Sequence, residues 1–325
     1  MPIKQENHAV YALKALLAFF VVIIHTPVYG REFISPLTSI AVPCFYLING
    51  YYLYFSDNKD TELHRASQSI KKIFFLNIKI NTIYYIIFSL AGLCFSLKNI
   101  ILSIFSGVGG ITIHTWYLAA LWEALIIFYL IRRYAPSLIY VTSFLFLVNP
   151  AIGTYSFIYN GDECNFYFLK LSFITVALPY ISIGYLIAKH KTLITINRPS
   201  YWIFCLFFLL FLEKNILFYL DMNRRLSDLL LIAPCSVILT ISAFSNSGKT
   251  YKPIYILEKK HSANIYYYHV LIGCVSGRIQ NYLFDYKSID AFIVFFASVI
   301  LSMCINFFSH YSKKLISIFT SSKKN

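Results

Sequence analysis

Two ionisable residues, Lys14 and His25, interrupt the first long apolar segment of this sequence. An imidazole exchanges protons near neutral pH, and an ammonium group attracts anions. Eleven residue steps correspond to about 16 Å along a helix and to within about 20° of whole turns, so both side chains are expected on one helix face. Ionisable groups at membrane depth are costly and are usually functional or paired. The alternative is a lysine that snorkels to the interface and a histidine hydrogen-bonded there.

A second group of polar side chains stands near the start of a later apolar segment. His114 and Trp116 begin that segment, and we expect them at about the depth of His25. Glu123 follows Trp116 by seven residues, so both are expected on nearly the same helix face. Glu123 could pair with a buried cation or orient a histidine. The alternative for Trp116 is an anchor in the aromatic belt at the membrane interface.

His269 belongs to an apolar segment that we expect to begin near residue 263. It would then lie about seven residues into its helix, a depth nearer to Lys14 than to His25. Direct pairing of His25 with His269 is therefore predicted to be improbable in straight helices. A structural role, or a role at the Lys14 end, is favoured for His269.

The composition decides which class of element positions these residues. Of 325 residues, 58% are apolar and only 13% are charged, whereas soluble domains carry roughly a quarter charged residues. The 30 Phe and 27 Tyr exclude an unfolded chain. A net charge of +14 would indicate nucleic-acid binding in a soluble protein. In an apolar chain it indicates the excess of Lys and Arg in cytoplasmic loops, and we expect no nucleic-acid partner.

The sequence predicts an all-α, polytopic membrane protein, because its apolar runs are continuous and lack the period-two alternation of barrel strands. A spanning helix needs roughly 20 mostly apolar residues. Ten candidate spans are 9–29, 36–55, 73–95, 113–131, 138–152, 167–188, 201–220, 227–245, 263–283 and 289–311. The fifth is short, which suggests a tilted or broken helix.

The basic residues predict the orientation. With the N-terminus in the cytoplasm, eighteen Lys and Arg fall in cytoplasmic segments and five on the opposite side. This asymmetry predicts that both termini are cytoplasmic. The lysine cluster at 249–260 is interpreted as part of this charge bias. We expect one transmembrane domain over residues 1–325 and no soluble domain.

The seven cysteines suggest neither a metal site nor a disulfide framework. No pair forms C-x-x-C, and six lie in apolar runs, where a free cysteine behaves as a small hydrophobe. Cys164 alone falls in a loop, on the predicted outer side.

Four short motifs follow one another along the chain: Lys14-x10-His25, the segment 42–51 (VPCFYLINGY), the segment 114–118 (HTWYL) and the segment 262–269 (SANIYYYH). In this order they resemble the motifs of the acyltransferase family 3 membrane enzymes. Three positions depart from the usual family pattern. Asn49 replaces the usual Ser, Lys14 stands where Arg is commoner, and lysines at 71, 72 and 79 stand near the arginine-rich approach to the third helix.

The resemblance implies an O-acyltransferase of the bacterial cytoplasmic (inner) membrane. It would move an acetyl group from cytoplasmic acetyl-CoA, or an acyl group from another acyl-CoA, to a hydroxyl of a surface glycan or lipid-linked sugar. No bound cofactor is implied. His25 would be the general base or a transient acyl carrier. The implied donor-binding residues are Lys14, Lys71, Lys72 and Lys79, and the implied acceptor-site or supporting residues are Asn49, His114, Trp116, Glu123 and His269.

Two other functions are compatible with many spans and buried charges. One is a transporter or flippase for a glycan or lipid-linked intermediate, although the sequence lacks the inverted repeats common in that class. The other is a scaffold or sensor subunit of an envelope complex. Release of CoA by the purified protein would separate an acyltransferase from both.

Overall fold

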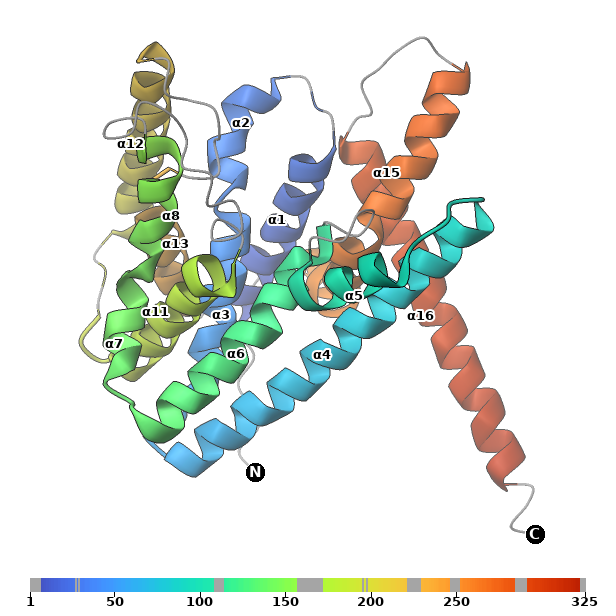
Figure 1. The fold of residues 1–325 in the computed structure, drawn as a ribbon, viewed down its shortest axis with the longest axis horizontal. Helices are drawn as coiled ribbons and strands as arrows, with labels where there is room; N and C mark the ends of the chain where they lie inside the picture. Colours follow the sequence, from blue (N-terminus) through green and yellow to red (C-terminus); the bar gives the residue numbers. More distant parts are fainter. Residues whose placement is uncertain are drawn as a thin grey trace. The chain divides into compact units, whose positions relative to one another are not determined.

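The computed structural model describes residues 7–26, 28, 30–107, 114–156, 172–194, 196, 198–220, 229–245, 252–283 and 291–321. Every regular element in these ranges is a helix, which confirms the predicted all-α class (Figure 1). Five helical segments there are long and apolar enough to cross a membrane: His8–His25, Phe33–Leu53, Lys59–Leu90, Pro199–Tyr219 and Ala291–Ser309. The count of ten spans and the orientation of the chain stay predictions.

The chain forms two compact units, each with its own internal contacts. The first combines Met1–Arg31 with Ser247–Asn325, and the second comprises Glu32–Asn246. The first unit therefore joins the two ends of the sequence.

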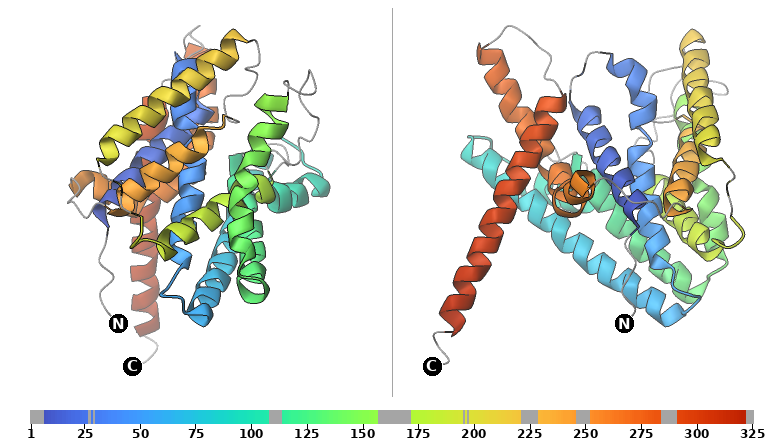
Figure 2. Two further views of the ribbon diagram at one scale, coloured as in Figure 1. Left: turned by 90° about the vertical axis from the view of Figure 1, so that its left-hand side faces the viewer. Right: turned by 180° about the vertical axis from the view of Figure 1, so that it is seen from behind.

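The first unit consists of one N-terminal helix and the C-terminal helices. Its elements are α1 (His8–His25), α14 (Lys252–Leu257), the π-helical turn η6 (Glu258–Ser262), α15 (Ala263–Leu283) and α16 (Ala291–Ser321). Residues 252–283 are helical without a break, so the helix that contains the predicted span 263–283 begins eleven residues earlier. The first half of α16 crosses α15, and its second half extends away from α15 (Figure 2).

Local sequence sets the limits of α1. The side chain of Asn7 accepts hydrogen bonds from the backbone N–H groups of Ala9 and Val10, at 3.0 and 3.2 Å, as an N-cap residue does. Thr26 ends the helix in an extended conformation, which is expected for a residue that precedes a proline. Along its length, α1 packs against the C-terminal helices, for example through Phe19, whose ring lies 5.1 Å from those of Phe292 and Phe295.

The second unit contains the remaining elements. They are α2 (Arg31–Thr38), α3 (Ala41–Leu53), α4 (Lys59–Leu90), α5 (Leu97–Ser106), α6 (Trp116–Tyr134), α7 (Leu138–Thr142), η2 (Ser143–Leu147), α8 (Val148–Ile152), η3 (Thr154–Ser156), η4 (Phe173–Ala177), α11 (Leu178–Lys189), α12 (Pro199–Tyr219) and α13 (Ile232–Ser245). The predicted span 138–152 is broken into α7, the 3-10 turn η2 and α8, as its short length suggested.

The helix that contains most of the predicted span 73–95 begins fourteen residues before that span, because α4 starts at Lys59. The side chain of Asn58 caps the helix by accepting the N–H of Thr61 at 3.0 Å. Asp60 and Glu62 occupy the first turn, where the helix dipole favours negative charge. These polar signals extend the helix well before the apolar run begins.

Helices α4 and α6 run antiparallel and side by side (Figure 1). Near one end Glu62 binds Arg132, in the middle the rings of Phe74 and Trp122 lie 5.3 Å apart, and near the other end Thr115 donates to Asn81 at 3.4 Å. These three contacts fix the register of the two helices and so the depth of the α6 residues.

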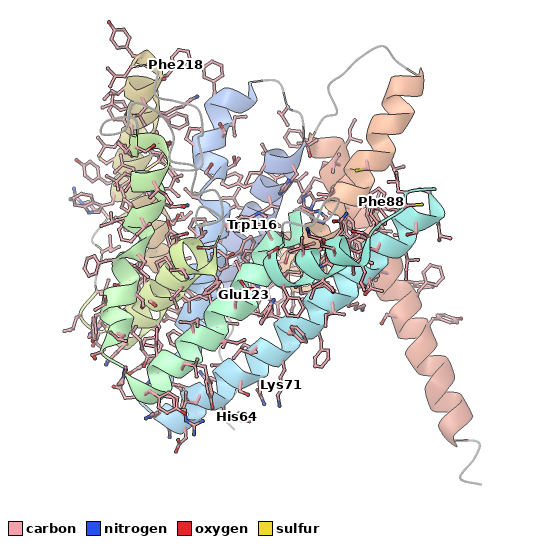
Figure 3. The ribbon with its side chains drawn as sticks, in the orientation of Figure 1. His64, Lys71, Phe88, Trp116, Glu123 and Phe218 are labelled. Atoms are coloured by element: carbon pink, nitrogen blue, oxygen red, sulfur yellow. The ribbon has the colours of Figure 1, made fainter. Side chains whose placement is uncertain are left out.

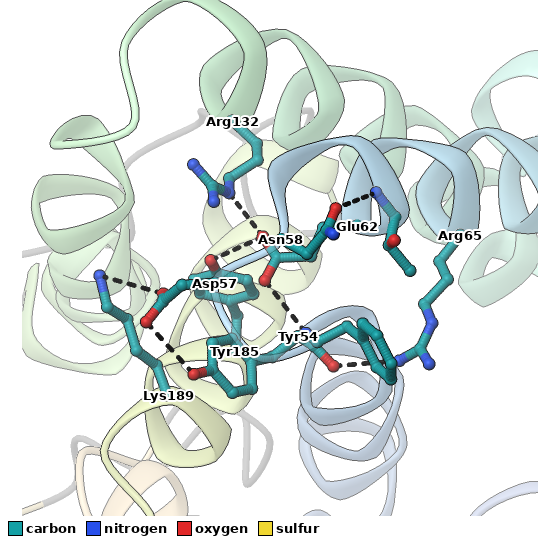
Figure 4. A network of polar contacts seen from close by, with 10 residues as sticks. Tyr54, Asp57, Asn58, Glu62, Arg65, Arg132, Tyr185 and Lys189 are labelled. Atoms are coloured by element: carbon teal, nitrogen blue, oxygen red, sulfur yellow. Dashed lines mark hydrogen bonds and ion pairs between the residues drawn. The ribbon is translucent and has the colours of Figure 1, made fainter. Parts of the chain in front are cut away.

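A buried carboxylate joins the ends of four helices in this unit (Figure 4). Glu62 is fully buried and accepts hydrogen bonds from Arg132 Nε at 2.6 Å, from the Tyr185 hydroxyl at 2.9 Å and from the Phe55 N–H at 3.0 Å. Arg65 donates to the carbonyl oxygen of Tyr54 at 3.0 Å on the same turn. The α3–α4 turn is thereby fastened to α6 and α11.

Candidate functional site

The first unit holds a charged pair near the start of α1. Lys14 Nζ forms an ion pair with Glu258 Oε1 at the first residue of η6. The Glu258 side chain is only 3% exposed, whereas that of Lys14 is 31% exposed. A buried carboxylate needs such a partner because the desolvation of an isolated charge is expensive. Sequence reasoning identified Lys14 but missed Glu258.

A second pair lies at the other end of α1. The rings of His25 and His269 are 5.2 Å apart between centroids and inclined by 45°. His25 is exposed, whereas His269 is 1% exposed. The prediction that these two histidines would not pair is wrong. Its premise was a helix that begins near residue 263, but the helical segment begins at Lys252, so His269 lies eleven residues farther from the start of its helix than expected.

The two pairs have the same spacing on both helices. Eleven residues separate Lys14 from His25 on α1, and eleven separate Glu258 from His269 on the η6–α15 segment. The two helices therefore run parallel, with matching side chains at two levels about 16 Å apart. The repeated spacing in the sequence was the signal that could have identified Glu258.

His25 occupies the last position of α1. The carbonyl groups that end a helix carry a partial negative charge, which stabilises a positive charge on a side chain in the last turn. The Thr26 hydroxyl donates to the Val22 carbonyl at 2.6 Å and satisfies one of these groups. An exposed imidazole in this place can meet a reactant and hold the proton it removes.

The second unit surrounds Asn49 with aromatic residues. Asn49 Nδ2 donates to the Phe45 carbonyl at 2.8 Å and lies 3.4 Å from the Tyr117 hydroxyl. The Tyr117 ring stacks on that of Tyr46 at 4.7 Å. The structure thus brings Asn49 to the helix that begins with Trp116.

His114 and Trp116 lie where α6 begins. His114 is 3% exposed, and its ring lies 4.5 Å from that of Tyr84. Trp116 contacts the end of α5 closely, since a Cβ on Gly107 would lie 2.2 Å from Trp116 Cα. Gly107 also has a φ of +65°, so this contact requires glycine.

Glu123 and the three lysines of α4 have fewer contacts. Glu123 is partly buried on α6, and within the described ranges it forms no ion pair with a cation and no hydrogen bond with a histidine. Lys71, Lys72 and Lys79 are exposed, and no described carboxylate forms an ion pair with them. Lys71 projects from α4 on the side away from α6 (Figure 3).

Comparison with known proteins gives one match. The acyltransferase family 3 model, described as an acyltransferase domain, matches residues 7–311. No curated protein and no solved structure matches the chain. The family match covers nearly the whole chain, including all four motifs and both paired levels of α1, and the apolar helices agree with a membrane location. The chain therefore belongs to acyltransferase family 3 and is a membrane acyltransferase.

Proposed function

We propose that this protein transfers an acetyl group from cytoplasmic acetyl-CoA to a hydroxyl of an exported surface glycan or lipid-linked sugar. The observation that carries the proposal is the exposed imidazole of His25 at the end of α1, eleven residues beyond the Lys14–Glu258 pair. In the predicted orientation, in a bacterial inner membrane crossed many times by the chain, Lys14 faces the donor's side and His25 the acceptor's side.

In this mechanism His25 is the general base. The acceptor hydroxyl gives its proton to a ring nitrogen of His25 as its oxygen attacks the thioester carbon. The carbon–sulfur bond then breaks, and the departing thiolate takes the proton from the imidazolium. The end of α1 stabilises the positive charge that His25 carries between these events. The other route is attack by His25 itself, with an acetyl-histidine intermediate that the acceptor then consumes.

The donor contacts proposed for the first unit are made by Lys14. Its ammonium group has three N–H donors, and the ion pair with Glu258 also fixes its position. Because the pair is neutral overall, Lys14 would hold the donor by a directed hydrogen bond more than by net charge. In the second unit, Lys71, Lys72 and Lys79 supply exposed positive charge for the phosphates of CoA.

The acceptor contacts proposed for the second unit come from Asn49, His114, Trp116 and Glu123. An amide, an imidazole and a carboxylate can hydrogen-bond sugar hydroxyls, and an indole adds apolar surface. His114 is buried beside Tyr84, so we propose that it shapes this region from behind, while Glu123 lies about seven residues deeper.

His25→Gln in the purified full-length protein tests the proposal. With acetyl-CoA and a surface oligosaccharide, CoA thiol release is expected to fall by roughly 100-fold or more, as loss of a general base predicts. The matched control is His64→Gln, which changes an exposed histidine whose Nε2 lies 2.8 Å from the Gln68 amide and is expected to be fully active. Wild-type activity in His25→Gln would refute the role of His25.

The wild-type protein also separates the competing functions. A transporter or a scaffold would release no CoA from acetyl-CoA under these conditions. Mass spectrometry of surface glycans from cells with and without the gene should show the loss of one acyl increment. Glycans that are unchanged in acylation, but fewer at the surface, would favour transport.

A further inference from the structure

Aromatic and basic side chains gather where the N-terminal end of α1 meets α14. The Tyr255 ring of α14 lies 5.1 Å from the ring of His8 and 5.1 Å from the ring of Tyr11, both on α1. These separations are typical of aromatic pairs in contact. All three residues are only partly buried, so the cluster keeps aromatic surface that another molecule can reach.

Two ammonium groups lie against these rings. Lys259 Nζ is 5.1 Å from the centre of the Tyr255 ring and donates a hydrogen bond of 2.6 Å to the Tyr255 hydroxyl. Lys14 Nζ is 6.0 Å from the centre of the Tyr11 ring and also forms the ion pair with Glu258. A cation within about 6 Å of a ring centre is attracted by the electrons of the ring. Lys259 is exposed, so an anion can approach its ammonium group.

This combination of groups matches the chemistry of a nucleotide. Aromatic side chains stack against the flat face of a base, and an ammonium group binds phosphate as a point charge. Tyrosines also anchor helices at the membrane interface, and lysines attract anionic lipids. Each of these two explanations accounts for one kind of residue, and neither requires that rings and cations of two helices meet in one cluster.

We propose that this cluster binds the adenine nucleotide end of the acyl-CoA donor. The base packs on the rings of His8, Tyr11 and Tyr255, and Lys259 contacts a phosphate of the same nucleotide. This inference rests on the proposed function, because that function supplies acyl-CoA as the donor. The exposed lysines of α4 would act by charge alone, whereas this cluster recognises a base and a phosphate together.

The position of the cluster along α1 fits the shape of the donor. Tyr11 lies three residues before Lys14 and fourteen before His25, or about 5 Å and about 21 Å along the helix. In acyl-CoA a pantetheine arm, which is of comparable length when extended, separates the nucleotide from the thioester. With the nucleotide at the cluster, the arm would pass Lys14, whose ammonium group can donate to an amide carbonyl oxygen of the arm.

Tyr255→Leu in the purified full-length protein tests the contact with the base. Leucine keeps an apolar side chain but removes the ring, so the KM for acetyl-CoA is expected to rise roughly tenfold with little change in kcat. The KM for S-acetylpantetheine, a donor without a nucleotide, should stay unchanged. Tyr255→Phe keeps the ring and should remain within about threefold of the wild-type KM. The matched control is Tyr311→Leu, which removes an exposed tyrosine of α16 on the same predicted side of the membrane.

Lys259→Met tests the contact with the phosphate. The KM for acetyl-CoA is expected to rise about two- to fivefold at low salt, and the rise should shrink at high salt because ions screen an exposed charge. The KM for S-acetylpantetheine, which has no phosphate, should again stay unchanged. Lys260→Met is the matched control, because Lys260 is also exposed but adjacent residues point to different faces of a helix. Equal effects of the two substitutions would overturn the phosphate contact.

A measurement on the wild-type protein avoids the risk that a variant fails to fold. The probe is 3′-phosphoadenosine 5′-phosphate, the nucleotide part of CoA, which should compete with acetyl-CoA. On illumination its 8-azido derivative should label peptides that contain residues 8–14 or 252–260, and CoA should suppress the labelling. Labelling confined to other peptides would overturn the inference, as would an equal rise in the KM of Tyr255→Leu for both donors.

The remaining outcomes separate this inference from its alternatives. If the nucleotide does not compete, and phosphatidylglycerol bound to the wild type is lost in Lys259→Met, the cluster binds a lipid head group and the inference is overturned. If Tyr255→Leu has the KM of Tyr311→Leu while His25→Gln is inactive, the inference fails and the proposed function stands. If the wild-type protein releases no CoA, the proposed function itself fails.

Discussion

Gly50 of α3 and Gly184 of α11 each lie against the backbone of the other's helix. A Cβ on Gly50 would be 2.1 Å from the carbonyl oxygen of Ile181, and a Cβ on Gly184 would be 2.1 Å from that of Leu47. The contact is reciprocal, so the two helices cross at a distance that only glycine allows on both sides. Small residues at such crossings are typical of helix packing in membranes.

Substitution of either glycine by alanine should therefore destabilise the second unit. The opposing atoms are backbone atoms that cannot rotate away. We therefore expect each substitution to lower the free energy of unfolding by about 1–3 kcal/mol. Gly273→Ala is the matched control, since a Cβ there would meet no atom within 4 Å and alanine favours a helix. Thermal unfolding in detergent should show lower melting temperatures for Gly50→Ala and Gly184→Ala only. Equal melting temperatures in all three variants would contradict the close crossing.

Removal of Lys14 and removal of Glu258 should lower the stability of the protein by different amounts. Lys14→Met leaves the Glu258 carboxylate, which is 3% exposed, without its cation. The free energy of unfolding is expected to fall by about 3 kcal/mol. Glu258→Gln leaves a lysine that is 31% exposed and can reach water, for an expected loss of about 1 kcal/mol.

The double variant Lys14→Met/Glu258→Gln should be more stable than Lys14→Met alone, because it leaves no buried charge. Chemical or thermal unfolding of all four proteins in one detergent completes the cycle. Additive losses in the double variant would show that the two groups do not interact.

The stability of the first unit should fall on mild acidification because of His261. Burial, with a smaller effect of the Lys260 charge, lowers the pKa of His261 from its ordinary value of 6.5. Its Nδ1 contacts the Ser302 hydroxyl at 2.9 Å. As pH falls below 6.5, the unfolded chain binds a proton at this histidine before the folded chain does. The stability contributed by neutral His261 is therefore complete above pH 6.5 and is lost as pH falls through the lower pKa of the folded state.

Melting temperatures of the wild type and of His261→Gln between pH 8 and pH 5 check this expectation. The difference between the two proteins should narrow or reverse toward pH 5, since glutamine does not titrate. Parallel curves over the whole range would exclude a contribution of His261 to the pH dependence.

The exposed lysines of α4 should act on the donor through charge. Lys72→Ala is expected to raise KM for acetyl-CoA about two- to fivefold at low salt, since an exposed ionic contact contributes up to about 1 kcal/mol. The effect should shrink at high ionic strength. Lys98→Ala is the matched control, because Lys98 is also exposed but lies on the predicted opposite side of the membrane. Equal effects of the two substitutions would argue against the predicted orientation or against the donor role.

The class of the protein was predictable because it depends on composition and on long apolar runs. The all-α prediction and the family assignment are confirmed, α1 and α12 begin and end near the predicted spans, and α15 ends at the predicted residue. Helix ends were less predictable. Lys59 starts α4 fourteen residues before the apolar run, because a capping asparagine and acidic first-turn residues extend a helix without any apolar signal.

The candidate site was predictable on one helix and not on its neighbour. Lys14 and His25 stand out because each interrupts an apolar run. Glu258 lies beside Lys259 and Lys260 in a polar stretch that resembles a loop, so its burial depends on a tertiary contact. The position of His269 along its helix depends on where that helix begins. The start at Lys252 could not be predicted, because the first turns are polar and give no apolar signal.

The π-helical turn from Glu258 to Ser262 allows the position of Glu258 to be changed without a change in the position of His269. A π turn contains about one residue more than the α-helical turn it replaces. Deletion of Lys260 would convert it to a regular turn and rotate Glu258 by about 100° relative to His269, while His269 stayed beside His25. A single deletion could thus detach the ionic end of the helix pair while leaving the imidazole end assembled.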